Sequence, residues 1–131
     1  MLGGTAHVIS GSGGSLSSQG VGAEIVYSGT DTFTFISTYN RYGYIYDDLQ
    51  MFVETTTPVL NVQYPINYIK EQSGQSEYYD GTERYYANMQ SSYVIFTRYD
   101  AAVISGSFYF VSLPVNGKTI SLSEGWFDIQ R

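Results

Sequence analysis

The chain contains no cysteine and a single histidine, His7. Without cysteine there is no disulfide framework, no thiolate nucleophile and no zinc site built on sulfur. A Ser-His-Asp triad would have to use His7, and no Gly-Xaa-Ser-Xaa-Gly elbow between a strand and a helix presents a serine nucleophile. The sequence therefore argues against a hydrolytic triad, and any bound metal would depend on oxygen ligands.

Charge is also scarce. Charged residues make up 14% of the chain, with 6 Lys or Arg against 12 Asp or Glu and a net charge of −6. The few basic residues are scattered along the sequence, so no cluster is available to neutralise phosphates. We therefore expect no nucleic-acid partner and no binding to anionic membrane surfaces.

Long apolar runs are absent, and we expect no transmembrane segment. The opening MLGGTAHVIS has no charged segment followed by an apolar one, so it is not a signal peptide. A composition rich in Tyr, Ser, Thr and Gly and poor in Lys and Glu is typical of secreted β-proteins. We expect a secreted or cell-envelope location, with the leader peptide absent from the given sequence.

The length of 131 residues suits one domain whose core needs no disulfide or metal. The best helix candidate, YDDLQMFVE, has β-branched and aromatic neighbours that favour a strand. We predict a single all-β domain over residues 1–131, an antiparallel β-sandwich of about 8–10 strands, with a partly closed β-barrel as the alternative. The Gly/Ser-rich segment 11–20, GSGGSLSSQG, is expected to be a flexible loop and lacks the lysine of a phosphate-binding loop.

The C-terminal third predicts three consecutive strands. Alternation assigns one set of residues to the core: Val94, Phe96, Ile104, Phe108, Phe110, Ile120, Leu122 and Phe127. Tyr93, Tyr109 and Trp126 fall on the opposite face. The dipeptide Asn116-Gly117 predicts a tight turn, and a bulge or bend near Gly125 is needed to keep the last strand in phase.

The same third carries an ordered set of short motifs: Thr97-Arg98-Tyr99-Asp100, Ile104-Ser105-Gly106-Ser107-Phe108-Tyr109-Phe110, Asn116-Gly117-Lys118-Thr119 and Gly125-Trp126-Phe127. This order resembles the C-terminal pattern of a family of small, uncharacterised secreted or lipoprotein β-domains of Bacteroidota. The resemblance implies a secreted or envelope location. It implies no activity, because the family has no assigned chemistry to carry over. Trp126 and the dense tyrosines at 78–86 are not part of the shared pattern.

Aromatic residues are abundant where charge is scarce, with 14 Tyr, 7 Phe and 1 Trp. Their flat faces stack on sugars and peptides, and the phenol or indole adds a polar contact. The candidates for ligand binding are Tyr42, Tyr44 and Tyr46 in one alternating row, Tyr79 and Tyr86 around the Asp80-Gly81 hairpin turn, and Trp126. The alternative for each tyrosine is packing within a sheet, where cross-strand pairs are stabilising.

The carboxylates suggest two further hypotheses. Calcium would need a loop such as Asp-Xaa-Asp-Xaa-Asp-Gly, which is absent, so Asp31, Asp47 and Asp48 are better explained as solvated turn residues. Asp80 and Asp100 are likewise expected to stabilise turns. A glycosidase would need two carboxylates facing each other across a cleft. We expect no metal and no cofactor.

These patterns predict a non-enzymatic, secreted or cell-envelope β-domain that binds a glycan, a peptide or a protein at the cell surface through exposed aromatic residues. The alternative is a purely structural, self-assembling envelope protein, in which the tyrosines pack within sheets or against neighbouring chains. A carboxylate-based glycoside hydrolase is the remote alternative.

Overall fold

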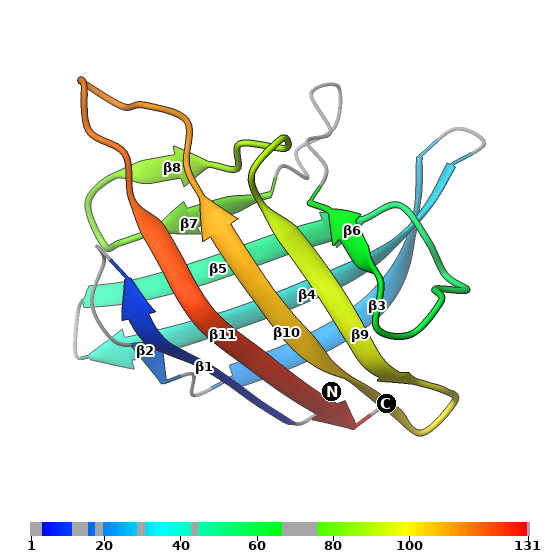
Figure 1. The fold of residues 1–131 in the computed structure, drawn as a ribbon. Coiled ribbons are helices and arrows are strands. Elements are labelled where there is room, and N and C mark those ends of the chain that lie inside the picture. The colour runs from blue at the N-terminus through cyan, green and yellow to red at the C-terminus, as the bar shows by residue number, and fades with distance from the viewer. Residues whose placement is uncertain are drawn as a thin grey trace.

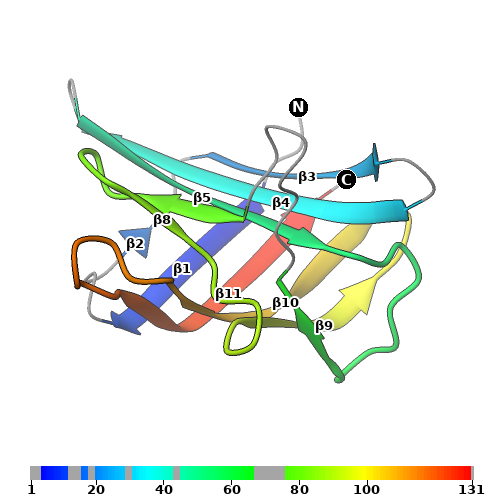
Figure 2. The same ribbon diagram turned by 90° about the horizontal axis from the view of Figure 1, so that it is seen from above.

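The computed structural model describes residues 4–11, 16–17, 20–28, 31–42, 45–66 and 76–130. In these residues eleven β-strands form two antiparallel sheets (Figure 1). The sheets lie face to face as two layers and do not close into a barrel (Figure 2), so the predicted β-sandwich is confirmed. The strand count exceeds the predicted 8–10, and four of the strands have only two or three residues. The described part of the chain contains no helix long and apolar enough to cross a membrane.

One sheet has six strands in the spatial order β2-β1-β11-β10-β9-β6. Their bounds are Leu16–Ser17 for β2, Gly4–Gly11 for β1, Ser121–Gln130 for β11, Val103–Val111 for β10, Tyr93–Tyr99 for β9 and Gln63–Pro65 for β6. Strand β2 lies inside the Gly/Ser-rich segment expected to be a loop, and it pairs with His7 and Val8 of β1. The proline-containing β6 is an edge strand, a position that tolerates a missing N–H donor.

The other sheet has five strands in the order β3-β4-β5-β7-β8 and crosses the first obliquely (Figure 1). Their bounds are Gly20–Ser28 for β3, Asp31–Tyr42 for β4, Ile45–Val53 for β5, Glu77–Tyr79 for β7 and Arg84–Tyr86 for β8. Leu49, Met51 and Val53 alternate into the core from β5, so the segment that also resembled a helix is a strand.

The core lies between the inner faces of the two sheets. All eight residues that alternation assigned to it are buried. They pack in one cluster with residues of the five-stranded sheet, among them Ile36, Met51 and Tyr78. Strand β10 shows the cause most clearly, because its even-numbered residues are buried and its odd-numbered residues are partly exposed.

A hydrogen-bonded pair joins the two sheets through this core. The Thr34 hydroxyl on β4 is fully buried and donates to the Thr55 carbonyl oxygen at 2.6 Å. The Tyr99 hydroxyl on β9 lies 2.6 Å from the same Thr34 oxygen. Since Thr34 has only one hydroxyl proton, Tyr99 must be the donor in this second bond. The chain of bonds satisfies a buried polar group that would otherwise destabilise the core.

The turns predicted at Asn116-Gly117 and Asp80-Gly81 are present, whereas Asp47 and Asp48, which were expected in a turn, lie within strand β5. Asn116 and Gly117 have φ of 52° and 76°, the left-handed conformation that Asn-Gly adopts in a two-residue hairpin, and Val115 and Lys118 exchange backbone hydrogen bonds across the turn. Between β7 and β8, the Asp80 carboxylate accepts the N–H groups of Thr82 and Glu83. These bonds explain why Asp occupies this position.

The predicted bulge in the last strand is confirmed. From Leu122 to Gly125 strand β11 advances three residues, while β10 advances two, from Phe108 to Phe110. The extra residue returns Phe127 to the core face shared with Leu122 and sends Trp126 outward. Gly125 lies against the ring of Phe108, which a Cβ atom would approach to 2.3 Å. Only glycine fits this position without displacing the ring.

Candidate functional site

The prediction that Tyr42, Tyr44 and Tyr46 form one alternating row is wrong, because Tyr42 and Tyr46 lie on different strands. Strand β4 ends at Tyr42 and β5 begins at Ile45, and these two residues are paired across antiparallel strands. Tyr46 is paired with Arg41, and Tyr42 is paired with Ile45. Because successive positions of a strand alternate between the two faces of the sheet, positions 42 and 46 belong to opposite faces. Tyr44 lies outside the described residues. A Tyr-Xaa-Tyr pattern cannot by itself distinguish one strand from the end of one and the start of the next.

Tyr79 and Tyr86 lie on the hairpin of β7 and β8 and are half-buried. The Tyr79 hydroxyl donates to the Gly81 carbonyl at 2.9 Å, and the Arg84 guanidinium lies 4.9 Å from its ring centroid. Arg84 in turn forms an ion pair with Glu77, the residue opposite Tyr86. These contacts favour the packing alternative for Tyr79.

Trp126 is 38% exposed on the outer face of the six-stranded sheet, the face to which alternation assigned it. It lies on β11, which has a paired strand on each side. The residue opposite it on β10 is Ser107, and the residue opposite it on β1 is His7. Because Ser107 carries only a hydroxymethyl group, the β10 side of the indole is flanked by a short polar side chain.

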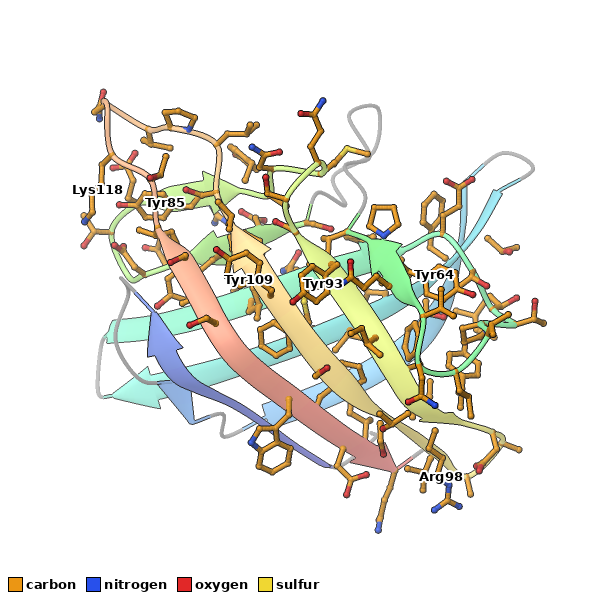
Figure 3. All side chains as sticks on the ribbon, viewed as in Figure 1. Tyr64, Tyr85, Tyr93, Arg98, Tyr109 and Lys118 are labelled. Atoms are coloured by element: carbon orange, nitrogen blue, oxygen red, sulfur yellow. The ribbon has the colours of Figure 1, made fainter. Side chains whose placement is uncertain are left out.

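Two tyrosines share this face. Tyr93 on β9 and Tyr109 on β10 are directly opposite, with ring centroids 5.8 Å apart, and both are half-buried. Figure 3 shows them next to each other on the outer face of the sheet. Tyr109 is two residues from Ser107, so it is the diagonal neighbour of Trp126. We call Tyr93, Tyr109 and Trp126 the aromatic face.

The six predicted binding residues do not include Tyr93 and Tyr109, although strand alternation places both on the face of Trp126. Alternation in the C-terminal strands is therefore the sequence signal that locates this face. The density of tyrosine in the middle segment is a poorer guide, because Tyr79 packs within its hairpin.

A recess of about 170 Å³ adjoins the aromatic face at Tyr93. It lies between edge strand β6 and the turn that precedes β9, and it is lined by Gln63, Pro65, Met89, Gln90, Ser91, Ser92 and Tyr93. Pro65 is the residue paired with Tyr93, which makes the recess continuous with the tyrosine pair. The described residues of its lining include no Asp, Glu, Lys or Arg.

The wall of the recess is held by hydrogen bonds to strand β10. The buried Ser92 hydroxyl donates to the Val111 carbonyl and accepts the Val111 N–H, both at 2.9 Å. Asn88 donates its backbone N–H to the same carbonyl and accepts the N–H of Ser92. The Asn88 side chain also accepts the N–H of Gln90. A turn fixed at this many points presents a preformed surface.

Charged groups on the same sheet lie along a different row. Arg98, Ser105 and Asp128 are paired across β9, β10 and β11. Ser105 donates to the Asp128 carboxylate at 2.6 Å, and Arg98 donates to the Asp100 carboxylate at 2.7 Å. In Figure 3, Arg98 lies at the opposite end of β9 from Tyr93.

Asp100 stabilises the turn between β9 and β10, as the sequence predicted. The hydrogen bond from Arg98 and those from the backbone N–H groups of Ala102 and Val103 lower the pKa of its carboxyl group from 3.8 to about 2. All three bonds favour the ionised form. A lowered pKa in the folded state means that this stabilisation is complete above pH 3.8 and is lost as the pH falls toward 2.

We expect an NMR titration of the Asp100 carboxyl carbon to give a pKa of about 2 in the wild type. Arg98→Met should raise this pKa toward 3.8, because the largest of the stabilising bonds is removed. Arg84→Met provides the matched control, since Arg84 forms its ion pair with Glu77 and its replacement should leave the Asp100 pKa unchanged. An unchanged Asp100 pKa in Arg98→Met would contradict the assignment.

Among the described residues, no group of three or more His, Asp or Glu side chains is placed to hold a metal ion. Comparison of the chain with protein-family models, with curated proteins and with solved structures found no match. The aromatic face and its recess are therefore the features of the described residues that bear on function.

Proposed function

We propose that this protein is a non-enzymatic β-domain that binds a glycan on the aromatic face, in a secreted or cell-envelope setting. The observation that carries the proposal is the exposed indole of Trp126. It lies on a strand that is paired on both sides, and its diagonal neighbour is Tyr109, which is paired with Tyr93. The location rests on the composition and on the C-terminal resemblance.

A sugar matches this surface better than a peptide does. Peptides that bind β-proteins add a strand at a free edge or lay side chains into an apolar groove. The aromatic face lies on β9, β10 and β11, each of which is paired on both sides. This face offers ring surfaces for the C–H groups of a sugar, with phenol and serine hydroxyls beside them for its O–H groups.

Binding is also favoured over hydrolysis. A glycosidase requires two carboxylates on opposite sides of the scissile bond. In the part of the chain that the structure describes, no carboxylate lines the recess. On the outer face of the sheet, the Asp128 carboxylate accepts a hydrogen bond from Ser105. Neither of these two residues lines the recess.

The presence of one tryptophan in the chain makes the test direct, because all indole emission comes from Trp126. We expect an oligosaccharide identified on a glycan array to shift this emission to shorter wavelength and to protect it from acrylamide. Trp126→Ala should weaken binding at least about tenfold, the usual effect of removing a central aromatic contact. Leu113→Ala, which truncates a side chain that is 45% exposed outside the aromatic face, should bind as the wild type does.

Two results would contradict the proposal. One is glycan binding of unchanged affinity in Trp126→Ala. The other is an oligomer without glycan that shields Trp126 from acrylamide and dissociates in Trp126→Ala, which would establish the structural, self-assembling alternative.

A further inference from the structure

We infer that the ligand is a neutral oligosaccharide that extends from Trp126 across Tyr109 and Tyr93 into the recess, and that chains of acidic sugars are excluded. This inference rests on the proposed function and specifies its ligand class.

The distance between Trp126 and the recess favours a chain of sugars over a single sugar. Tyr93 and Trp126 lie two strands apart in the sheet, and their positions differ by two residues along the strand direction. Their backbones are therefore about 12 Å apart. The recess extends the path beyond Tyr93, on the side away from Tyr109. A ligand that touches the indole and also fills the recess must therefore be longer than one ring.

The chemistry of the recess is polar but uncharged. The side-chain amides of Gln63 and Gln90 and the hydroxyl of Ser91 belong to exposed residues and supply both donors and acceptors. Pro65, Met89 and Tyr93 are the apolar and aromatic residues of the same lining. Sugar rings present the same alternation of C–H surface and hydroxyl groups.

Electrostatics disfavour a carboxylate in this position. Three cations have described side chains, and none of them lines the recess: Arg84 is paired with Glu77, Arg98 with Asp100, and Lys118 lies 5.9 Å from the Tyr85 ring centroid. The anionic Asp128 belongs to the outer face of the same sheet, and the chain as a whole carries a net charge of −6. Among the described side chains, a uronic acid in the recess would find no cationic partner to offset its loss of hydration.

The test is an array of neutral and uronic-acid oligosaccharides, followed by calorimetry on the strongest hits as a length series. We expect neutral hits only, affinity that rises at least about tenfold from monosaccharide to tetrasaccharide, and less than a twofold change between 50 and 500 mM NaCl. The double variant Gln63→Ala, Gln90→Ala should weaken the tetrasaccharide about tenfold while leaving the monosaccharide unchanged. Thr119→Ala, an exposed polar residue outside the face and the recess, is the matched control.

Failure of this inference differs from failure of the proposed function. Uronic-acid chains that bind as tightly as neutral ones, or a monosaccharide that binds as tightly as the tetrasaccharide, would overturn the inference if Trp126→Ala still weakened binding at least about tenfold. An array without any hit, or hits unaffected by Trp126→Ala, would overturn both.

Discussion

Gly106→Ala is expected to lower the free energy of unfolding by at least about 3 kcal/mol. A Cβ atom at this position would lie 2.1 Å from the Ile95 carbonyl oxygen and 2.9 Å from the Phe127 ring. The carbonyl belongs to the neighbouring strand β9, so it cannot rotate away as a side chain can. Relief requires β9 and β10 to separate locally, which breaks ladder hydrogen bonds between two inner strands.

Urea unfolding followed by far-UV circular dichroism measures this effect. Gly117→Ala is the control, because no atom lies within 4 Å of its Cβ position and the only strain is the positive φ of 76°. That strain costs about 1–2 kcal/mol. If Gly106→Ala proved no more destabilising than Gly117→Ala, the close approach of β9 to β10 would be wrong.

Phe127→Ala is expected to destabilise the protein by about 3–5 kcal/mol, the range for removing a fully buried phenyl ring. Phe127 is 1% exposed, and its ring centroid lies 6.0 Å from that of Phe96 and 6.4 Å from that of Phe108. The bulge in β11 brings it into this aromatic group, and the cavity left by alanine would adjoin both rings.

The adjacent substitution Trp126→Ala is the matched control, measured by the same unfolding experiment. It removes a larger side chain from the outer face, and we expect a cost below about 1 kcal/mol, because a substitution on the solvent side leaves no core cavity. Equal losses for the two variants would contradict the assignment of faces. A stable Trp126→Ala variant also ensures that its loss of glycan binding reports the contact rather than unfolding.

Local patterns predicted much of the C-terminal sheet. Period-two alternation assigned Phe108 and Phe110 to the core, and Asn116-Gly117 located a tight turn, because both signals act between neighbours in the chain. The bulge near Gly125 followed from the change of phase between Leu122 and Phe127. The same reasoning failed at Tyr42 and Tyr46, where an alternating pattern continues across the boundary between two strands.

The sequence by itself determined the all-β class, the core set of the last three strands and the outward position of Trp126. Only the tertiary structure decided what surrounds that indole. Strand β1 pairs with β11 from the far end of the chain, and β6 joins β9 to make the recess beside Tyr93. Pairing between distant segments depends on loop closure and on the fit of whole faces, which no local pattern encodes. Strand alternation in the sequence therefore predicts which residues form the aromatic face. That this face adjoins the recess follows only from the pairing of β6 with β9 in the folded structure.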